Sequence, residues 1–165
     1  MADDPMKVSV ILPAAGQSKR FNADGGKQSK LETDLGGRAV FIRAAELFTD
    51  RPEVSQTLIA VDPDQVDTFK FRWGDKLGFL GVSIVAGGKA ERWETVLNAI
   101  EQVADGVTHI AVHDAARPVT DAALIDRVFE AAARFDAVIP GTPANATLKR
   151  TRSEEHTSEL QSLLI

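Results

Sequence analysis

The sequence lacks cysteine altogether, and it also lacks a long apolar run and a basic N-terminus. Without cysteine there are no disulfides, but 165 residues are enough to bury a core without them. No stretch approaches the roughly 18 uninterrupted apolar residues of a membrane span. Residues Met1 to Met6 carry no basic signal-peptide start. We therefore expect a cytoplasmic protein without membrane contact, in a reducing compartment, although many secreted proteins also lack cysteine.

A broad basic surface is missing as well. The chain has 19 Lys and Arg residues against 24 Asp and Glu residues, which gives a net charge of -5. This balance argues against binding nucleic acid through a basic face, so an anionic ligand must meet a few local cations. With 44% hydrophobic and 26% charged residues, the composition is that of a globular domain and not of a disordered chain.

Short apolar runs alternate with helical patterns along the chain. The runs predict buried strands at Val8–Leu12, Thr57–Val61, Val82–Val85, Ile110–Val112 and Ala137–Ile139. Apolar residues share one helical face in three places, which are Val40, Phe41, Ala44, Leu47 and Phe48; Trp93, Val96, Leu97, Ile100 and Val103; and Leu124, Ile125, Val128, Phe129 and Ala132. Pro63 to Leu80 predicts one helix plus an irregular connection. The alternation predicts an α/β fold, a three-layer Rossmann-like domain with a mostly parallel central sheet.

The first predicted strand ends at Ala14, Ala15 and Gly16, and cations follow. Glycine lets a backbone approach a ligand closely, and loop amides can point at phosphate oxygens. Arg20 and Lys27 supply positive charge for phosphate oxygens that amides alone cannot supply. The arginine offers a planar, forked guanidinium, and the lysine a compact charge on a flexible side chain. Because open α/β sheets bind ligands at the carboxyl ends of strands, this segment is a candidate phosphate loop. A glycine turn with solvated cations is the alternative.

Paired glycines, Gly87 and Gly88, follow the third predicted strand, and Arg92 and Thr95 open the next helix. Backbone amides and carbonyls freed by glycine can read the edge of a base, and a helix N-terminus favours an anion. Alone, the motif is also typical of a Gly-Gly turn with Thr95 facing solvent.

Asp114 follows the fourth predicted strand, and small residues come after it. A carboxylate at this edge suits Mg²⁺, which is often held by one or two carboxylates plus substrate phosphates. A turn aspartate is the alternative. Arg117 is placed to pair with Asp114 or with another acid. His109 and His113 are expected to be structural and not metal ligands.

Taken in order, these segments resemble the motifs of the 2-C-methyl-D-erythritol 4-phosphate cytidylyltransferases of the non-mevalonate isoprenoid pathway. The family's Ala-Ala-Gly-x-Gly-x-Arg motif, with a lysine a few residues on, matches Ala14–Gly16, Arg20 and Lys27. Ser18 stands for the second glycine. The likeness covers roughly Val8 to Arg150.

The remaining motifs of the family match in the same order. Gly-Gly, Arg and Ser-Val match Gly87–Gly88, Arg92 and Thr95-Val96, with one extra residue before the arginine. Asp-Ala-Ala-Arg-Pro is matched in full by Asp114–Pro118, and Asp-Thr-hydrophobic-Lys appears as Ala146–Lys149, with alanine for the aspartate.

The resemblance implies transfer of a cytidylyl group from CTP to 2-C-methyl-D-erythritol 4-phosphate, with release of pyrophosphate. Arg20 and Lys27 are then expected to stabilise the charge that builds on the phosphates, while Ala14, Ala15 and Gly16 cradle the triphosphate. The second motif, through Gly87, Gly88, Arg92 and Thr95, is expected to surround cytosine and ribose.

The same resemblance implies a sugar-alcohol phosphate as the second substrate and a hard divalent cation. Asp114 is expected to hold Mg²⁺ and to contact this substrate together with Arg117 and Thr147. The full-length family forms homodimers through a β-arm that crosses to the partner, and C-terminal residues close on both substrates.

The composition changes at Arg152, where the alternation of strands and helices stops. Arg152 to Ser162 looks like a translated frame of a common sequencing adapter. We expect a nucleotidyltransferase domain over residues 1–151, incomplete at its C-terminus, and a foreign tail over residues 152–165; a frayed terminal helix is the alternative. The β-arm and the closing C-terminal residues are then missing, which puts dimerisation of this chain in doubt.

Two other functions stay open. One is a ribitol 5-phosphate cytidylyltransferase, against which Ala116 argues, and the other is an inactive nucleotide-binding fragment.

Overall fold

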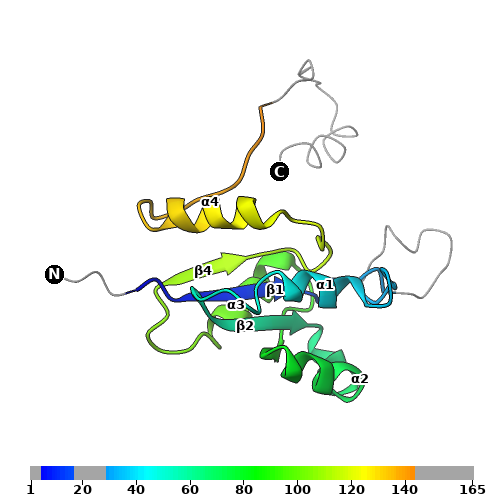
Figure 1. The fold of residues 1–165 in the computed structure, drawn as a ribbon. Helices are drawn as coiled ribbons and strands as arrows, with labels where there is room; N and C mark the ends of the chain where they lie inside the picture. The colour runs from blue at the N-terminus through cyan, green and yellow to red at the C-terminus, as the bar shows by residue number, and fades with distance from the viewer. Residues whose placement is uncertain (1–4, 17–28, 144–165) are drawn as a thin grey trace, which may run out of the picture. The chain divides into compact units, whose positions relative to one another are not determined.

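The computed structural model describes residues 5–16 and 29–143. The chain divides into two compact units, Met1–Asp121 and Ala122–Ile165. The elements of the first unit are β1 (Val8–Pro13), α1 (Val40–Glu46), β2 (Val54–Val61), the 3-10 helix η1 (Pro63–Gln65), α2 (Val66–Phe79), β3 (Val82–Ala86), α3 (Arg92–Ile100) and β4 (His109–Val112). Figure 1 labels all of these except η1 and β3. The second unit contains α4 (Ala122–Ala132). No helix in the described ranges is long and apolar enough to cross a membrane.

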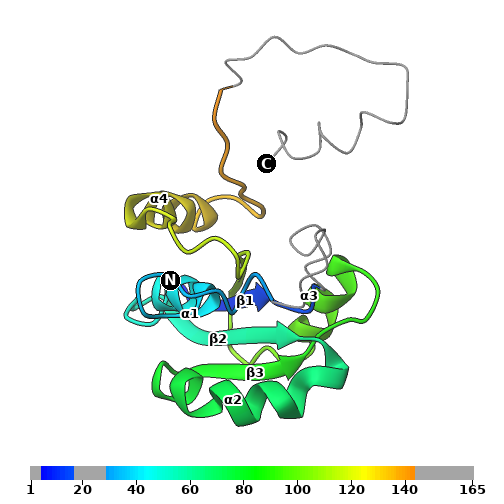
Figure 2. The ribbon, with the colours of Figure 1, turned by 90° about the vertical axis from the view of Figure 1, so that its right-hand side faces the viewer.

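The sheet of the first unit has the strand order β3-β2-β1-β4, and every neighbouring pair is parallel. In register, Val10 of β1 lies beside Thr57 of β2 on one side and Ala111 of β4 on the other. The strands of a parallel sheet end at one edge, and the arrowheads of β1, β2 and β3 in Figure 2 point the same way. The α/β fold with a parallel sheet is thereby confirmed.

One face of the sheet is covered by α3. Side chains alternate between the two faces along a strand. On this face Ile11, Leu58 and Ala60 form a buried cluster with Ala99 of α3. The connection from β3 to β4 carries α3 back across the sheet, past β2 and β1, which is why the helix lies over the central strands.

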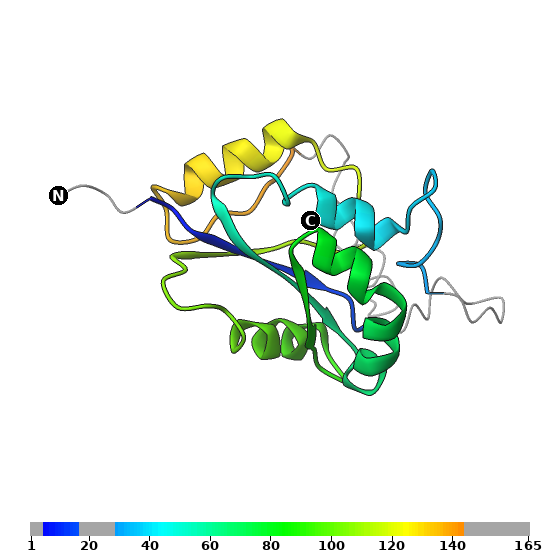
Figure 3. The same cartoon turned by 60° about the horizontal axis from the view of Figure 1, so that its bottom comes forward.

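The opposite face is covered by α1 and α2. The chain moves in one direction along the sheet from β1 to β2 to β3 and reverses for β4, so right-handed crossovers place α1 and α2 opposite α3 (Figure 3). The two helices meet through aromatic rings, since the Phe41 centroid lies 5.2 Å from that of Phe69 and 5.0 Å from that of Trp73. The first unit therefore has the three layers that the alternation predicts.

The segment from Pro63 to Leu80 is more regular than predicted. In place of an irregular connection, η1 leads directly into the 14-residue helix α2. The carboxylate of Asp62 accepts a hydrogen bond from the Asp64 amide at 2.9 Å, and Pro63 occupies the first helical position, where its missing N–H costs nothing. These residues begin the helical segment early.

The strand predicted at Ala137–Ile139 is wrong. These residues adopt no regular secondary structure, and Ile139 is 90% exposed. A strand needs a partner for its backbone hydrogen bonds. Within the described part of the second unit, residues 122–143, there is no strand to provide one, and Pro140 lacks an N–H.

The face predicted to bury α3 is only partly correct. Val103 packs against the buried cluster. Trp93, Leu97 and Ile100, however, are 64%, 48% and 39% exposed, whereas Thr95 and Ala99 are buried. Small side chains one helical turn apart let the helix approach the sheet closely. The close approach turns the large apolar residues toward solvent.

Candidate functional site

The loops that follow β1, β3 and β4 leave the sheet at one edge. The Ala14 amide donates to the Ala60 carbonyl of β2 at 2.7 Å, and the Gly87 amide donates to the Val61 carbonyl at 2.7 Å. The His113 amide donates to a carbonyl of β1 at 2.9 Å. The fold therefore brings the three predicted motifs together at the edge where ligands of parallel sheets bind.

The first motif contacts the second through Ala15 and Gly87. A Cβ added to Gly87 would lie 3.3 Å from the Cβ of Ala15 and 2.7 Å from Cγ2 of Thr95. A Cβ added to Gly88 would lie 2.4 Å from the Cβ of Glu94. Both glycines are buried, so the chain itself requires the absence of a side chain at these two positions.

Gly16 differs from this pair. It is exposed, its φ is outside the left-handed region, and, apart from its own chain neighbours, no described residue has an atom within 4 Å of the position that a Cβ would take. The described part of the fold does not require glycine here. Arg20, Lys27 and Thr147 lie outside the described residues.

The second motif contacts the third through a cluster of three charges. A terminal guanidinium nitrogen of Arg92 lies 2.6 Å from Oδ1 of Asp114, and Nε of Arg117 lies 2.9 Å from Oδ2. The pair expected between Arg117 and Asp114 is therefore present, and Arg92 adds a second cation. Partial burial alone raises the pKa of the Asp114 carboxyl, but the hydrogen bonds and charges of Arg92 and Arg117 outweigh it, and the pKa lies below its ordinary value.

The geometry around Asp114 does not fit a metal ligand. Both carboxylate oxygens already accept hydrogen bonds from guanidinium groups, and two positive charges at this distance oppose a third. In the described ranges there is also no group of three or more His, Asp or Glu side chains able to hold a metal ion. In this arrangement Asp114 orients Arg92 and Arg117.

The loop between β3 and α3 is fixed by side chains of the helix that follows it. The Glu94 carboxylate accepts hydrogen bonds from the amides of Ala90 and Glu91 at 3.1 and 3.2 Å, as part of a capping box. The Thr95 hydroxyl, which is buried beneath the loop, accepts from the Gly88 amide at 3.1 Å.

Asn98 also contacts this loop, although it belongs to none of the predicted motifs. Its Nδ2 donates to the Gly87 carbonyl at 2.9 Å. The available indication was its position three residues after Thr95, which places both side chains on one side of a helix.

His113 has a structural role in the geometry observed. Its Nε2–H donates to the Arg117 carbonyl at 2.9 Å, and its ring packs edge-on against Phe48 with centroids 5.1 Å apart. Burial lowers the pKa of His113 from its ordinary value, despite the hydrogen bond to Arg117 and the nearby Asp114 charge. The neutral imidazole therefore holds the loop that carries Asp114 and Arg117.

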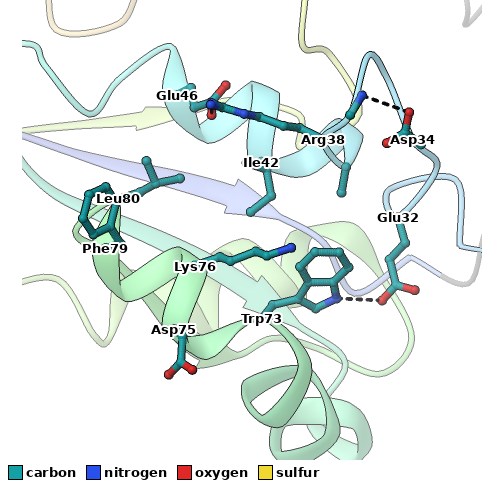
Figure 4. Close-up of a pocket in the computed structure, with 12 residues that line it drawn as sticks. Glu32, Asp34, Arg38, Ile42, Glu46, Trp73, Asp75, Lys76, Phe79 and Leu80 are labelled. Carbon is teal, nitrogen blue, oxygen red and sulfur yellow. Dashed lines mark hydrogen bonds and ion pairs between the residues drawn. The ribbon is translucent and has the colours of Figure 1, made fainter.

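Two cavities differ in their relation to the motifs. One of about 370 Å³ lies beside the β3–α3 loop and is lined by Pro63, Gly87, Gly88, Lys89, Trp93, Glu94, Leu97 and Asn98. A larger one, of about 640 Å³, lies between α1 and α2, and no motif residue lines it (Figure 4). Its polar groups pair with each other, for example Arg38 with Glu46, and Trp73 Nε1 with Glu32 at 3.2 Å. The smaller cavity therefore belongs to the candidate site, and the larger does not.

Comparison with known proteins gives one consistent family. The family model described as IspD: 2-C-methyl-D-erythritol 4-phosphate cytidylyltransferase matches residues 8–163. The enzyme of that name from Rhodopirellula baltica is 35% identical over 158 residues, covering 89% of this chain and 63% of the relative. The one from Frankia casuarinae is 38% identical over 151 residues, covering 90% and 53%.

A solved structure supports the fold. The 4-diphosphocytidyl-2C-methyl-D-erythritol synthase from Anaerococcus prevotii superposes with a TM-score of 0.72 at 21% identity, covering 92% of this chain and 62% of that one. The chain thus spans less than two thirds of the length of these relatives. The domain boundary expected at residue 151 stays a prediction, because the matched range runs through it and residues 144–165 lie outside the described structure.

Proposed function

The chain belongs to the 2-C-methyl-D-erythritol 4-phosphate cytidylyltransferase family, and from this we propose that it transfers a cytidylyl group from CTP to 2-C-methyl-D-erythritol 4-phosphate. The observation that carries the proposal is the contact of the three motifs at one sheet edge. Ala15 lies against Gly87, and Arg92 pairs with Asp114.

The proposed reaction is an in-line displacement at phosphorus. A phosphate oxygen of the acceptor forms a bond to the α-phosphorus of CTP. The bond from this phosphorus to the oxygen bridging to the β-phosphorus breaks, and its electron pair leaves with pyrophosphate. Because the nucleophile is already an anion, no general base is needed. The protein must align the two phosphates and stabilise the charge that builds between them.

We assign the stabilisation of charge to Arg20 and Lys27. Ala14, Ala15 and Gly16 are proposed to cradle the triphosphate, and the exposed Gly16 adds no side chain between the backbone and a ligand. Gly87, Gly88, Arg92 and Thr95 are proposed to form the base and ribose site, where Thr95 acts from beneath the loop.

The acceptor phosphate is assigned to the arginine cluster. Arg117, oriented by Asp114, presents a guanidinium that suits a phosphate, and Thr147 is proposed as a further contact. No step depends on a metal at Asp114, since its charge is already met by Arg92 and Arg117; magnesium stays a prediction of the family resemblance. Dimer formation and a cytoplasmic location also stay predictions.

Release of pyrophosphate tests the proposal. The purified chain is incubated with CTP and either methylerythritol phosphate, ribitol 5-phosphate or no acceptor, while CTP binding is measured by calorimetry. We expect pyrophosphate with methylerythritol phosphate alone, and we expect Asp114→Asn to reduce it. Asp75→Asn, at an exposed position of the larger cavity, is the matched control.

Two outcomes would overturn the proposal in different ways. Turnover with ribitol 5-phosphate alone would change the acceptor and leave cytidylyl transfer in place. Binding of CTP without turnover on any acceptor would identify a nucleotide-binding fragment, consistent with a chain shorter than its relatives.

A further inference from the structure

A single peptide group in the β3–α3 loop is held at both ends by α3. The peptide joining Gly87 to Gly88 has its carbonyl bonded to Asn98 Nδ2 at 2.9 Å and its amide bonded to the Thr95 hydroxyl at 3.1 Å. The amide before it, that of Gly87, donates to Val61 of β2. Two side chains of α3 hold this peptide, and the Val61 carbonyl of β2 holds the amide before it. Together they define the plane of the peptide.

Glycine makes such fixation necessary. A Gly-Gly segment has more backbone freedom than any other pair, so without external bonds it samples several orientations. Neither Gly87 nor Gly88 has a left-handed φ, so their conformation does not by itself restrict the loop to glycine. The glycines are instead required by the close contacts with Glu94 and Thr95, and the orientation is fixed by hydrogen bonds.

The bonds leave one backbone group of the pair available. Of the two amides and two carbonyls of Gly87 and Gly88, only the Gly88 carbonyl has no hydrogen-bond partner among the described residues. It belongs to residues that line the 370 Å³ cavity, which Asn98 also lines. A carbonyl can accept from the 4-amino group of cytosine but repels the 4-oxo group of uracil. Its direction depends on the plane of the neighbouring peptide together with the two torsions of Gly88, and it bears on the choice between the two bases.

We infer that Asn98 is a positioning residue, which locks the Gly87–Gly88 peptide and thereby holds the Gly88 carbonyl in the orientation that favours CTP over UTP. The inference rests on the proposed function for its nucleotide. Asn98 is suited to this role because its amide donates in a fixed direction, whereas the Thr95 hydroxyl rotates and takes the opposite end of the peptide. Removing the Asn98 donor leaves one end of the peptide free.

The ratio of activity with CTP to activity with UTP distinguishes a positioning role of Asn98 from a general stabilising role. In Asn98→Ala and Asn98→Asp, we expect KM for CTP to rise about tenfold, the size of one lost hydrogen bond, with kcat for CTP little changed. The ratio of kcat/KM for CTP over UTP is expected to fall by a similar factor. Asn98→Gln, which keeps an amide donor, is expected to recover part of the ratio. The control is Glu101→Ala, at an exposed position just after α3.

A merely structural Asn98 would lower activity with both nucleotides equally and leave the ratio unchanged, which would overturn the inference.

A second measurement, hydrogen exchange, does not depend on enzymatic activity. Hydrogen exchange of the Gly88 amide is expected to be about tenfold faster in Asn98→Ala and unchanged in Glu101→Ala. If the chain binds nucleotide without turnover, the proposed reaction fails, and the CTP-to-UTP ratio of binding constants then decides the role of Asn98. Unchanged Gly88 exchange, or loss of all nucleotide binding in the unaltered chain, would refute it.

Discussion

The guanidinium of Arg92 and the carboxylate of Asp114 meet at 2.6 Å, although the two residues lie 22 positions apart in the chain. The contact joins the first residue of α3 to the loop after β4. Arg117 occupies the other carboxylate oxygen. One acid therefore holds two cations, from two different motifs, at the edge of the sheet.

A double-mutant cycle measures how strongly this pair couples. Arg92→Ala and Asp114→Ala are each expected to destabilise, and the double variant is expected to lose less than the sum, with a coupling of about 0.5–1 kcal/mol. The value is small because Arg92 is largely exposed and solvent screens the pair. Urea unfolding of the four proteins at low and high salt gives the coupling, which salt should reduce. Arg92→Ala combined with Asp105→Ala, a change at an exposed acid, should be additive.

Gly88→Ala tests the close packing of the β3–α3 loop. The new Cβ would lie 2.4 Å from the Cβ of Glu94 and 2.8 Å from the Thr95 amide nitrogen, so backbone must move. We expect a loss of about 1–3 kcal/mol in the free energy of unfolding, measured by urea denaturation. Gly78→Ala is the control, because no atom lies near its added Cβ in α2 and alanine favours a helix. Equal effects of the two changes would contradict the packing account.

The buried neutral His113 makes stability depend on pH. Because burial lowers its folded pKa below the unfolded value of about 6.5, the unfolded chain binds more protons between the two values. The free energy of unfolding is therefore expected to fall as pH is lowered from about 6.5 through the folded pKa, and this contribution is complete above 6.5.

Urea unfolding across a pH series checks this expectation. His113→Gln keeps a donor for the Arg117 carbonyl but does not titrate, so it should lose the slope in that window. His109→Gln should retain it. A slope that persists in His113→Gln would assign the pH dependence to other groups.

Substitution of the proposed catalytic cations should separate rate from binding. Arg20→Ala or Lys27→Ala is expected to lower kcat by about a hundredfold or more while CTP binding weakens by less than about tenfold, because charge on the phosphates is greatest in the transition state. Pre-steady-state rates and calorimetry give the two quantities. Lys70→Ala, at an exposed position of α2, controls for loss of charge. Equal losses in rate and affinity would show that the cations serve ground-state binding.

The strands were predictable where burial dictates residue type. β1 and residues 57–61 of β2 are buried on both faces, so their sequences are nearly continuous apolar runs, interrupted only by the small polar residues Ser9 and Thr57. The motifs could be placed at the sheet edge for the same reason, because a parallel sheet fixes where every strand ends.

The sequence did not predict which side chains of α3 contact the sheet and the β3–α3 loop. Periodicity weighs large apolar residues such as Trp93 and Leu97, but α3 packs through Thr95 and Ala99, whose small size matters only once the sheet is in place. Likewise, the helical spacing places Asn98 on the same side as Thr95, but its hydrogen bond to the Gly87 carbonyl depends on how the loop folds back over the helix.

The exposure of Trp93 has an optical consequence. The chain holds only two tryptophans, and they sit in different surroundings. The Trp73 indole N–H donates to Glu32 and its ring meets Phe41, whereas Trp93 is largely exposed and lines the cavity beside Gly88. Trp73→Phe would leave a single fluorophore at the candidate nucleotide site. A ligand entering that cavity would remove water from the Trp93 ring and shift its emission to shorter wavelength, so the protein carries its own reporter of occupancy.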